Sequence, residues 1–272
     1  MNELTTDEFN KIRNYIKAQY GISLSDEKRT LVHSRLRSTL QELGMSTFSE
    51  YFDYLLNDKS GDALTRFVNK ITTNHTFFMR ETDHFDYLRE VVMPYIGEKY
   101  ASQKDLRLWC AACSSGEESV TLQIIAQEYL NSAGGNWNTQ ILATDISAQV
   151  LDRAVAAIYA SETLVDLPQG WQKSYFKEID SQFSKVNDII RSQIVYRRLN
   201  LMHEFRFKKT FQVIFCRNVM IYFDGPTREA VVKKFYSVME PGGYLFIGHS
   251  ESISNTGSGF LYVKPAVYRK PM

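Results

Sequence analysis

The stretch Leu106-Arg107-Leu108-Trp109-Cys110-Ala111-Ala112 is a short apolar run that leads directly into Cys113-Ser114-Ser115-Gly116-Glu117-Glu118. We expect a strand over 106–112, a tight turn of small residues, and then a helix over 119–130. A second apolar run, 140–144, ends on Asp145. Strand, turn, helix, strand and terminal acid form the opening unit of a nucleotide-binding α/β sheet, in which Asp145 would lie near ribose hydroxyls.

The turn at 113–118 carries one glycine and two acids instead of the G-x-G-x-x-G pattern of dinucleotide-binding turns. Gly116 has no Cβ atom and would let the backbone approach a ligand closely. Two carboxylates suit a pyrophosphate poorly, but they suit a ligand with positive charge, such as the ammonium and sulfonium of S-adenosylmethionine. The turn therefore favours S-adenosylmethionine over NAD.

Composition narrows the class of protein. The chain of 272 residues is long enough for one large domain or two smaller ones, and its formal net charge of +1 gives no field that favours nucleic acid or membranes. No apolar run approaches the roughly 20 residues that span a bilayer, and the polar start lacks a signal-peptide core. We expect a cytoplasmic protein. Three cysteines indicate reduced thiols, and without a Cys/His cluster of ligand spacing we expect no metal site.

The hydrophobic pattern divides the chain. Residues 1–70 place apolar side chains at three- and four-residue spacing, which predicts an all-helical N-terminal domain. Residues 106–272 alternate strands with helices, which predicts an α/β, Rossmann-like, mainly parallel sheet covered on both faces. We expect a linker and flap at 71–105 and a small inserted β subdomain at about 160–193. The other expected strands are about 194–199, 211–216 and 243–248, and the other helices about 147–157 and 227–239.

The segment 72–81 crowds polar groups beside two phenylalanines, which is unusual for a plain linker. As a flap over a ligand, it would offer hydrogen bonds from Asn74 and Thr76 and a guanidinium fork from Arg80 for a carboxylate. The same residues would also suit a helix cap with an aromatic anchor, and the pattern alone leaves both interpretations open.

A second group of polar residues follows the buried strand 211–216. Arg217 and Asn218 fall at its carboxyl end, the edge at which α/β sheets bind ligands, and Tyr222 follows within one loop. A surface arginine and a half-buried aromatic remain the alternative. After the last predicted strand, we interpret His249 and Glu251 as residues that end the strand and complete the pocket wall rather than as an acid–base pair.

Five motifs, in chain order, resemble those of the CheR family, the chemotaxis receptor glutamate methyltransferases. They are Thr-Thr-Asn-x-Thr-x-Phe-x-Arg-Glu at 72–81, Ala-Ala-Cys-Ser-Ser-Gly-Glu-Glu at 111–118, Ala-Thr-Asp-Ile at 143–146, Ile-Phe-Cys-Arg-Asn-Val-Met-Ile-Tyr-Phe-Asp at 214–224 and Gly-His-Ser-Glu-Ser at 248–252. The resemblance covers nearly the whole chain, and the run at 214–224 is very specific.

The resemblance implies S-adenosylmethionine as methyl donor, S-adenosylhomocysteine as product, and a receptor glutamate as acceptor that becomes a γ-glutamyl methyl ester. Arg80 and Tyr222 would lie closest to the transferred methyl group. The implied cofactor-binding residues are Asn74, Thr76, Arg80, Glu118, Asp145, Asn200, Leu201, Arg217 and Asn218. A glutamate carboxylate, with an ordinary pKa of about 4.3, is already a nucleophile at neutral pH. The enzyme would therefore act by positioning.

Two departures from the family pattern bear on the substrate. After Glu118, relatives often continue Pro-Tyr-Ser, whereas this chain has Ser119-Val120-Thr121. Some relatives carry a glycine-rich loop in the inserted subdomain that pairs with a tethering peptide at the receptor's C-terminus, but residues 176–193 contain no glycine. We therefore expect the protein to act on the cytoplasmic domain of chemotaxis receptors without that tether. Separately, we expect it to be a monomer.

Direct docking would then rest on a basic helical stretch. A broad positive patch would suit the acid-rich methylation helices of receptors, although a solvated charged face explains the same pattern equally well. The predicted docking residues are Lys28, Arg29, Arg35 and Arg37.

Two other functions remain open from the sequence. One is an S-adenosylmethionine enzyme for a small molecule or RNA, although near-neutral charge argues against RNA. The other is a non-catalytic signalling regulator that binds the cofactor, against which the presence of both Arg80 and Tyr222 argues.

Overall fold

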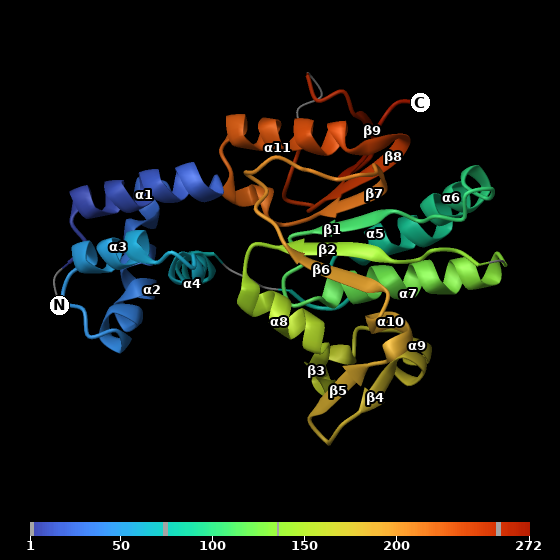
Figure 1. Ribbon diagram of the computed structural model, residues 1–272, viewed down its shortest axis with the longest axis horizontal. Coiled ribbons are helices and arrows are strands. Elements are labelled where there is room, and N and C mark those ends of the chain that lie inside the picture. Colours follow the sequence, from blue (N-terminus) through green and yellow to red (C-terminus); the bar gives the residue numbers. More distant parts are fainter. Residues whose placement is uncertain (1–2, 73–75, 135, 254–256) are drawn as a thin grey trace.

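The computed structural model describes residues 3–72, 76–134, 136–253 and 257–272, and its N-terminal part is helical (Figure 1). Thr5 and Thr47 begin two of these helices with capping boxes, in which each threonine pairs with the glutamate three residues later. Their apolar faces form a separate hydrophobic core. This arrangement confirms the predicted all-helical domain. The helices are α1 (Thr6–Tyr20), α2 (Arg29–Glu42), α3 (Phe48–Asn57) and α4 (Asp62–Ile71), with a short 3-10 turn η1 (Asp26–Lys28) before α2.

The predicted linker at 71–105 is largely helical instead. It contains α5 (Thr82–Tyr87), the π-helical turn η2 (Leu88–Val92) and α6 (Met93–Lys99). Phe85, Leu88, Val92 and Ile96 recur at three- and four-residue spacing and are buried against the sheet. This segment is therefore part of the α/β core.

The larger domain is built on a seven-stranded sheet in the order β6-β2-β1-β7-β8-β10-β9. The first five strands are parallel, β10 runs antiparallel to β8, and β9 runs antiparallel to β10. The parallel strands confirm the predicted α/β sheet, whereas β9 and β10 were not predicted. The strands are β1 (Leu108–Ala111), β2 (Ile141–Asp145), β6 (Ile194–Arg198), β7 (Phe211–Cys216), β8 (Met239–Ile247), β9 (Leu261–Lys264) and β10 (Val267–Arg269).

Successive residues of the central strands enter two different hydrophobic clusters, because side chains alternate across a sheet. Leu108 and Cys110 join the cluster of α5, α6 and α7 (Glu117–Ser132). Trp109 and Ala111 join the cluster on the opposite face, which α11 (Gly225–Ser237) covers. Trp109 is fully buried there, among the rings of Phe205, Phe207, Phe211 and Phe235. Helix α8 (Ala148–Ala156) packs beside β2 and β6.

A small antiparallel sheet of order β3-β5-β4 lies between α8 and β6, at the bottom of Figure 1. It confirms the predicted inserted β subdomain. Its strands are β3 (Ile158–Ala160), β4 (Phe176–Glu178) and β5 (Phe183–Val186), and its helices are η3 (Ser161–Leu164), α9 (Gln169–Tyr175) and α10 (Asp188–Arg191).

The helical domain contacts the sheet domain through the chain that follows α1. The Ser23 amide donates to the Tyr222 carbonyl at 2.8 Å, and Ile22 forms a bridge with Phe223. Lys17 lies 2.7 Å from the Asp224 carboxylate. These contacts hold the helical domain against the loop that carries Tyr222. No helix within the described ranges is long and apolar enough to cross a membrane.

Candidate functional site

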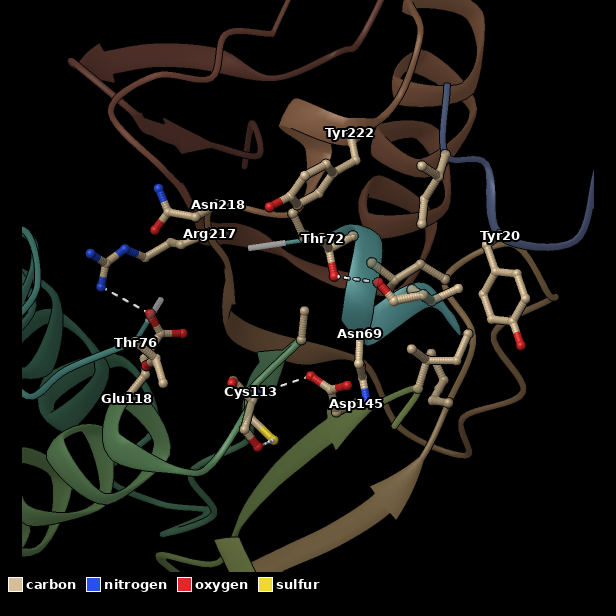
Figure 2. Close-up of a pocket in the computed structure, with 18 of the residues that line it drawn as sticks. Tyr20, Asn69, Thr72, Thr76, Cys113, Glu118, Asp145, Arg217, Asn218 and Tyr222 are labelled. Atoms are coloured by element: carbon tan, nitrogen blue, oxygen red, sulfur yellow. Dashed lines mark hydrogen bonds and ion pairs between the residues drawn. The ribbon is translucent and has the colours of Figure 1, made fainter. Parts of the chain in front are cut away.

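A pocket lies where the strand order reverses between β1 and β7, at the carboxyl ends of the parallel strands. This is the position at which open α/β sheets bind their ligands. Figure 2 shows Arg217, Asn218 and Tyr222 entering from one side of this pocket and Glu118, Cys113 and Asp145 from the other. The loops after β1, β2, β6 and β7 all contribute to its walls.

The residues implied as catalytic or cofactor-binding come together at this one pocket, although they are spread over about half the chain. Asn74 lies outside the described residues. The others all line the pocket: Thr76, Arg80, Glu118, Asp145, Asn200, Leu201, Arg217, Asn218 and Tyr222.

Arg217 is the centre of a buried ion-pair network. Its guanidinium lies 3.0 Å from Glu81 Oε2 and 2.9 Å from Glu118 Oε2, and it also donates to the Arg80 carbonyl. The Asn218 amide donates to the other oxygen of Glu81 at 3.1 Å. Burial raises the pKa of Glu81, but Arg217 and Asn218 outweigh it and the net shift is downward. The network therefore ties the segment 80–81 to the end of β7.

This network changes the interpretation of the acidic turn. Burial raises the pKa of Glu118 against the opposing effect of Arg217, with which it is paired. Glu117 accepts a hydrogen bond from the Ser115 hydroxyl at 2.8 Å. The two acids thus have partners within the protein. The sequence alone indicates a free negative site for a cation, but the structure shows that the two carboxylates are already paired.

Asp145 lies at the end of β2, where it was expected. Its carboxylate accepts hydrogen bonds from the Ser114 amide at 2.9 Å and the Ser147 amide at 3.0 Å. Burial raises the pKa of Asp145, and these amides act against that shift. A carboxylate held by two amides keeps lone pairs available, so it can accept further hydrogen bonds from a ligand.

Gly116 has a different role from the predicted one, since it is not among the residues that line the pocket. It begins α7 with a φ of +100°, a conformation that favours glycine. A Cβ atom at this position would lie 3.1 Å from the Ala154 Cα atom and 2.8 Å from the Tyr159 hydroxyl. The glycine therefore permits close packing of α7 against α8 and β3.

Glu251 organises the loop that carries Asn218 and Tyr222. Its buried carboxylate accepts from the amides of Gly248 at 2.6 Å, Asn218 at 3.0 Å and Ile221 at 3.0 Å. These bonds fix one pocket wall, in agreement with the interpretation from the sequence.

The helical domain supplies part of the pocket, which the sequence pattern did not predict. Tyr20, Ile22, Val68, Asn69 and Thr72 line it. The Asn69 amide donates to the Ser147 hydroxyl at 2.8 Å, beside Asp145. Asn69 lies on the polar side of α4, away from Leu64, Phe67 and Ile71, so its spacing did not distinguish it from a solvent-facing residue.

The predicted docking residues separate into two groups. Arg29 donates to the Leu4 carbonyl and the Thr6 hydroxyl, and Arg35 donates to the carbonyls of 70–72 at the end of α4. These two side chains thus bind the domain's own backbone. Arg37 is exposed, and the Lys28 ammonium lies 6.0 Å from the centre of the Tyr222 ring. The positively charged surface available to a partner is therefore smaller than the predicted patch.

A group of possible metal ligands lies outside the pocket lining. Within the described residues, Glu81, His84 and His249 bring carboxylate and imidazole donor atoms close together. The wide separation of His249 in the sequence hides this group from any search for ligand spacing.

Comparison with known proteins matches both domains. The family model described as the CheR methyltransferase, SAM binding domain matches residues 74–268, and the CheR methyltransferase, all-alpha domain matches residues 7–72. A chemotaxis protein methyltransferase of Borreliella burgdorferi is 38% identical over 98% of this chain and 95% of its own length. That of Escherichia coli is 33% identical over 97% of this chain and 91% of its own.

Solved structures overlap with the chain less extensively. The glycopeptide N-methyltransferase MtfA complexed with sinefungin gives a TM-score of 0.33 at 13% identity, over 58% of this chain and 48% of that one. The family matches, by contrast, extend over both domains. The chain therefore belongs to the CheR methyltransferase family, and S-adenosylmethionine is its cofactor.

Proposed function

We propose that the protein transfers the methyl group of S-adenosylmethionine to glutamate side chains of chemotaxis receptors in the cytoplasm, giving glutamyl methyl esters. Family membership and the chemotaxis methyltransferases among its relatives support methyl transfer in chemotaxis. The residues that line the pocket support glutamate as the acceptor.

The observation that carries this proposal concerns proton acceptors. The described lining includes no histidine, and burial raises the pKa of its thiol, Cys113. Its buried carboxylates have other partners: Glu118 pairs with Arg217, and Asp145 accepts from two backbone amides and would offer its remaining lone pairs to ribose hydroxyls. A site with few available bases suits an acceptor that is already ionised. A glutamate carboxylate meets this condition at neutral pH, whereas a protonated amine or a hydroxyl does not.

The pocket fits the cofactor chemically. Asp145 offers carboxylate oxygens to ribose hydroxyls, and Phe77, Ile146 and Val219 offer apolar surface to a base. When bound, S-adenosylmethionine supplies an activated methyl group on a sulfonium. The protein's task is then to orient the acceptor oxygen in line with that group and to exclude water.

Arg80 and Tyr222 are the proposed positioning groups for the acceptor. Both line the pocket, and the Arg80 guanidinium lies 6.0 Å from the centre of the Phe77 ring. Arg80 can hold a carboxylate through hydrogen bonds without adding a proton, because a guanidinium keeps its own protons. The Tyr222 hydroxyl can donate to the same carboxylate or to the cofactor.

Receptor docking is proposed to rest mainly on Lys28 and Arg37, while Arg29 and Arg35 support the local fold. Lys28 is close to the Tyr222 ring, and therefore close to the pocket. The glycine-free loop of the inserted subdomain supports docking without a C-terminal tether.

The activity is tested by incubating the full chain with methyl-labelled S-adenosylmethionine and receptor cytoplasmic fragments, each with and without its last five residues. We expect label that is released by base and maps to glutamate, with similar kcat/KM for both fragment lengths. Binding of cofactor without transfer would favour the regulatory function, and transfer to another side chain would exclude the glutamate acceptor. A large loss of kcat/KM on truncation would refute tether independence alone.

Docking is tested with the double variant Lys28→Glu, Arg37→Glu. Exposed pairs contribute about 0.2–1 kcal/mol each, so loss of two predicts a rise in receptor KM of about 2- to 30-fold at low salt. Cofactor affinity should stay unchanged. Lys173→Glu with Lys233→Glu is the matched control, since both lysines are exposed and the charge change is equal. Equal receptor KM in the two double variants would remove this docking surface.

A further inference from the structure

His84 is a buried histidine whose polar atoms are not used by the protein. Its side chain has 0% exposure, and neither ring nitrogen has a hydrogen-bond partner among the residues that the structure describes. Its Nδ1 lies 3.5 Å from Glu81 Oε2 without forming a hydrogen bond. Buried polar atoms normally have partners, so the two ring nitrogens of His84 mark a position that a bound water or ion would fill.

Two further donors face this imidazole. One ligand atom from each of Glu81, His84 and His249 can be chosen so that all lie within 4.8 Å of one another. Bonds of about 2.0–2.2 Å to a tetrahedral metal separate such donors by roughly 3.5 Å. The side chain of His249 is 44% exposed and can rotate to close the difference, while buried His84 stays fixed.

We propose that Glu81, His84 and His249 form a binding site for a first-row divalent cation, with Zn²⁺ the best match. Two imidazoles and one carboxylate, with a fourth position open to water, form a common zinc ligand set. Carboxylate alone would suit Mg²⁺ or Ca²⁺, but imidazole shifts the preference to Zn²⁺, Ni²⁺ or Cu²⁺.

The surroundings of the three ligands agree with metal binding. His249 Nε2 lies 3.0 Å from the Asp83 carboxylate, the kind of outer contact that orients a ligating histidine and leaves its other nitrogen free.

Arg217 is the main group that would repel a bound cation, because its positive charge is already paired with Glu81. Its guanidinium has a second carboxylate partner, Glu118, at 2.9 Å. Glu81 can therefore share its charge with a cation while Arg217 keeps an anionic partner. Lys264 lies 3.3 Å from the other Asp83 oxygen, so its positive charge also has a carboxylate partner.

The site is tested by calorimetric titration of the untagged full chain with Zn²⁺, followed by Co²⁺, whose visible spectrum reports coordination geometry. We expect one equivalent of Zn²⁺ to bind. His249→Gln, a change at a partly exposed side chain, should weaken binding by at least about tenfold. His203→Gln is the matched control, because this exposed histidine lies outside the cluster.

Failure to bind one equivalent of Zn²⁺ would overturn the site, as would equal affinity in His249→Gln and the parent. Equal weakening by His203→Gln would also overturn it, since binding would then be a general property of surface histidines. His84→Phe provides a second test that keeps the buried ring volume. Metal binding is measured directly, so a negative result leaves the proposed methyl transfer untouched, and the reverse also holds.

Discussion

Replacing Arg217 by methionine should lower the free energy of unfolding by about 3–5 kcal/mol, the range for removing one partner of a buried ion pair. The guanidinium lies 3.0 Å from Glu81 and 2.9 Å from Glu118, whose side chains are only 13% and 16% exposed. Methionine has a similar length and keeps contact with the Phe85 ring, which lies 5.3 Å from the guanidinium carbon. The loss is therefore mainly electrostatic. Glu118→Gln leaves the pair with Glu81 intact and should cost less, about 1–3 kcal/mol.

The cost should also depend on pH. In the parent, the pKa of Glu81 is held below its ordinary value of 4.5, so its stabilising effect is present above that value and is lost in acid. Without Arg217, burial would raise the pKa of Glu81 above its unfolded value, and the pKa of Glu118, already raised in the parent, would rise further. The variant would then lose stability as pH rises through that interval. The difference between parent and variant should accordingly widen from about pH 5 to about pH 8.

Urea unfolding followed by circular dichroism at both pH values measures this difference. Arg37→Met is the matched control, because this exposed arginine should change stability by no more than about 0.5 kcal/mol. A deficit below about 1 kcal/mol for Arg217→Met, or one that is the same at both pH values, would refute the buried network as the source of stability.

Three more variants test other parts of the site. Asp145→Ala should weaken S-adenosylmethionine binding by about 1–3 kcal/mol through lost ribose hydrogen bonds, and unchanged affinity in calorimetry would reject that role. Tyr222→Phe should lower kcat for methyl transfer with cofactor affinity retained, whereas transfer at the parent rate would limit Tyr222 to packing. Gly116→Ala should destabilise the fold by about 1–3 kcal/mol, because it combines a φ of +100° with contact at 3.1 Å to the Ala154 backbone, and an unchanged urea midpoint would contradict that geometry.

The sheet was predictable where local pattern and burial agree. The strands β1, β2 and β7 are short and mostly buried runs, and the polar residues Asp145, Arg217 and Asn218 stand at the carboxyl ends of β2 and β7, where such a sheet binds its ligand. The strands β9 and β10 escaped prediction because they are short and β9 is largely exposed, so they show no clear alternation. The helices at 82–99 escaped prediction, although Phe85, Leu88, Val92 and Ile96 recur in them at helical spacing.

The partners of the site residues could not be predicted from sequence. Glu118 lines the pocket, and its ion-pair partner, Arg217, is 99 residues away in the sequence. Arg29 and Arg35 were assigned to a surface, yet backbone carbonyls distant in sequence accept their hydrogen bonds. Such contacts depend on tertiary packing, which residue type and spacing along the sequence do not determine.

The position of Trp109 determines what optical measurements can detect. Its indole is enclosed by phenylalanine rings in the sheet domain, and the other tryptophans, Trp137 and Trp171, also lie after residue 105. Residues 1–72 contain tyrosines but no tryptophan. Tryptophan fluorescence therefore reports unfolding of the sheet domain alone, whereas far-ultraviolet circular dichroism reports unfolding of both domains. The difference between the melting curves recorded by fluorescence and by circular dichroism therefore measures how cooperatively the two domains unfold. Contacts such as that between Lys17 and Asp224 favour superimposable curves.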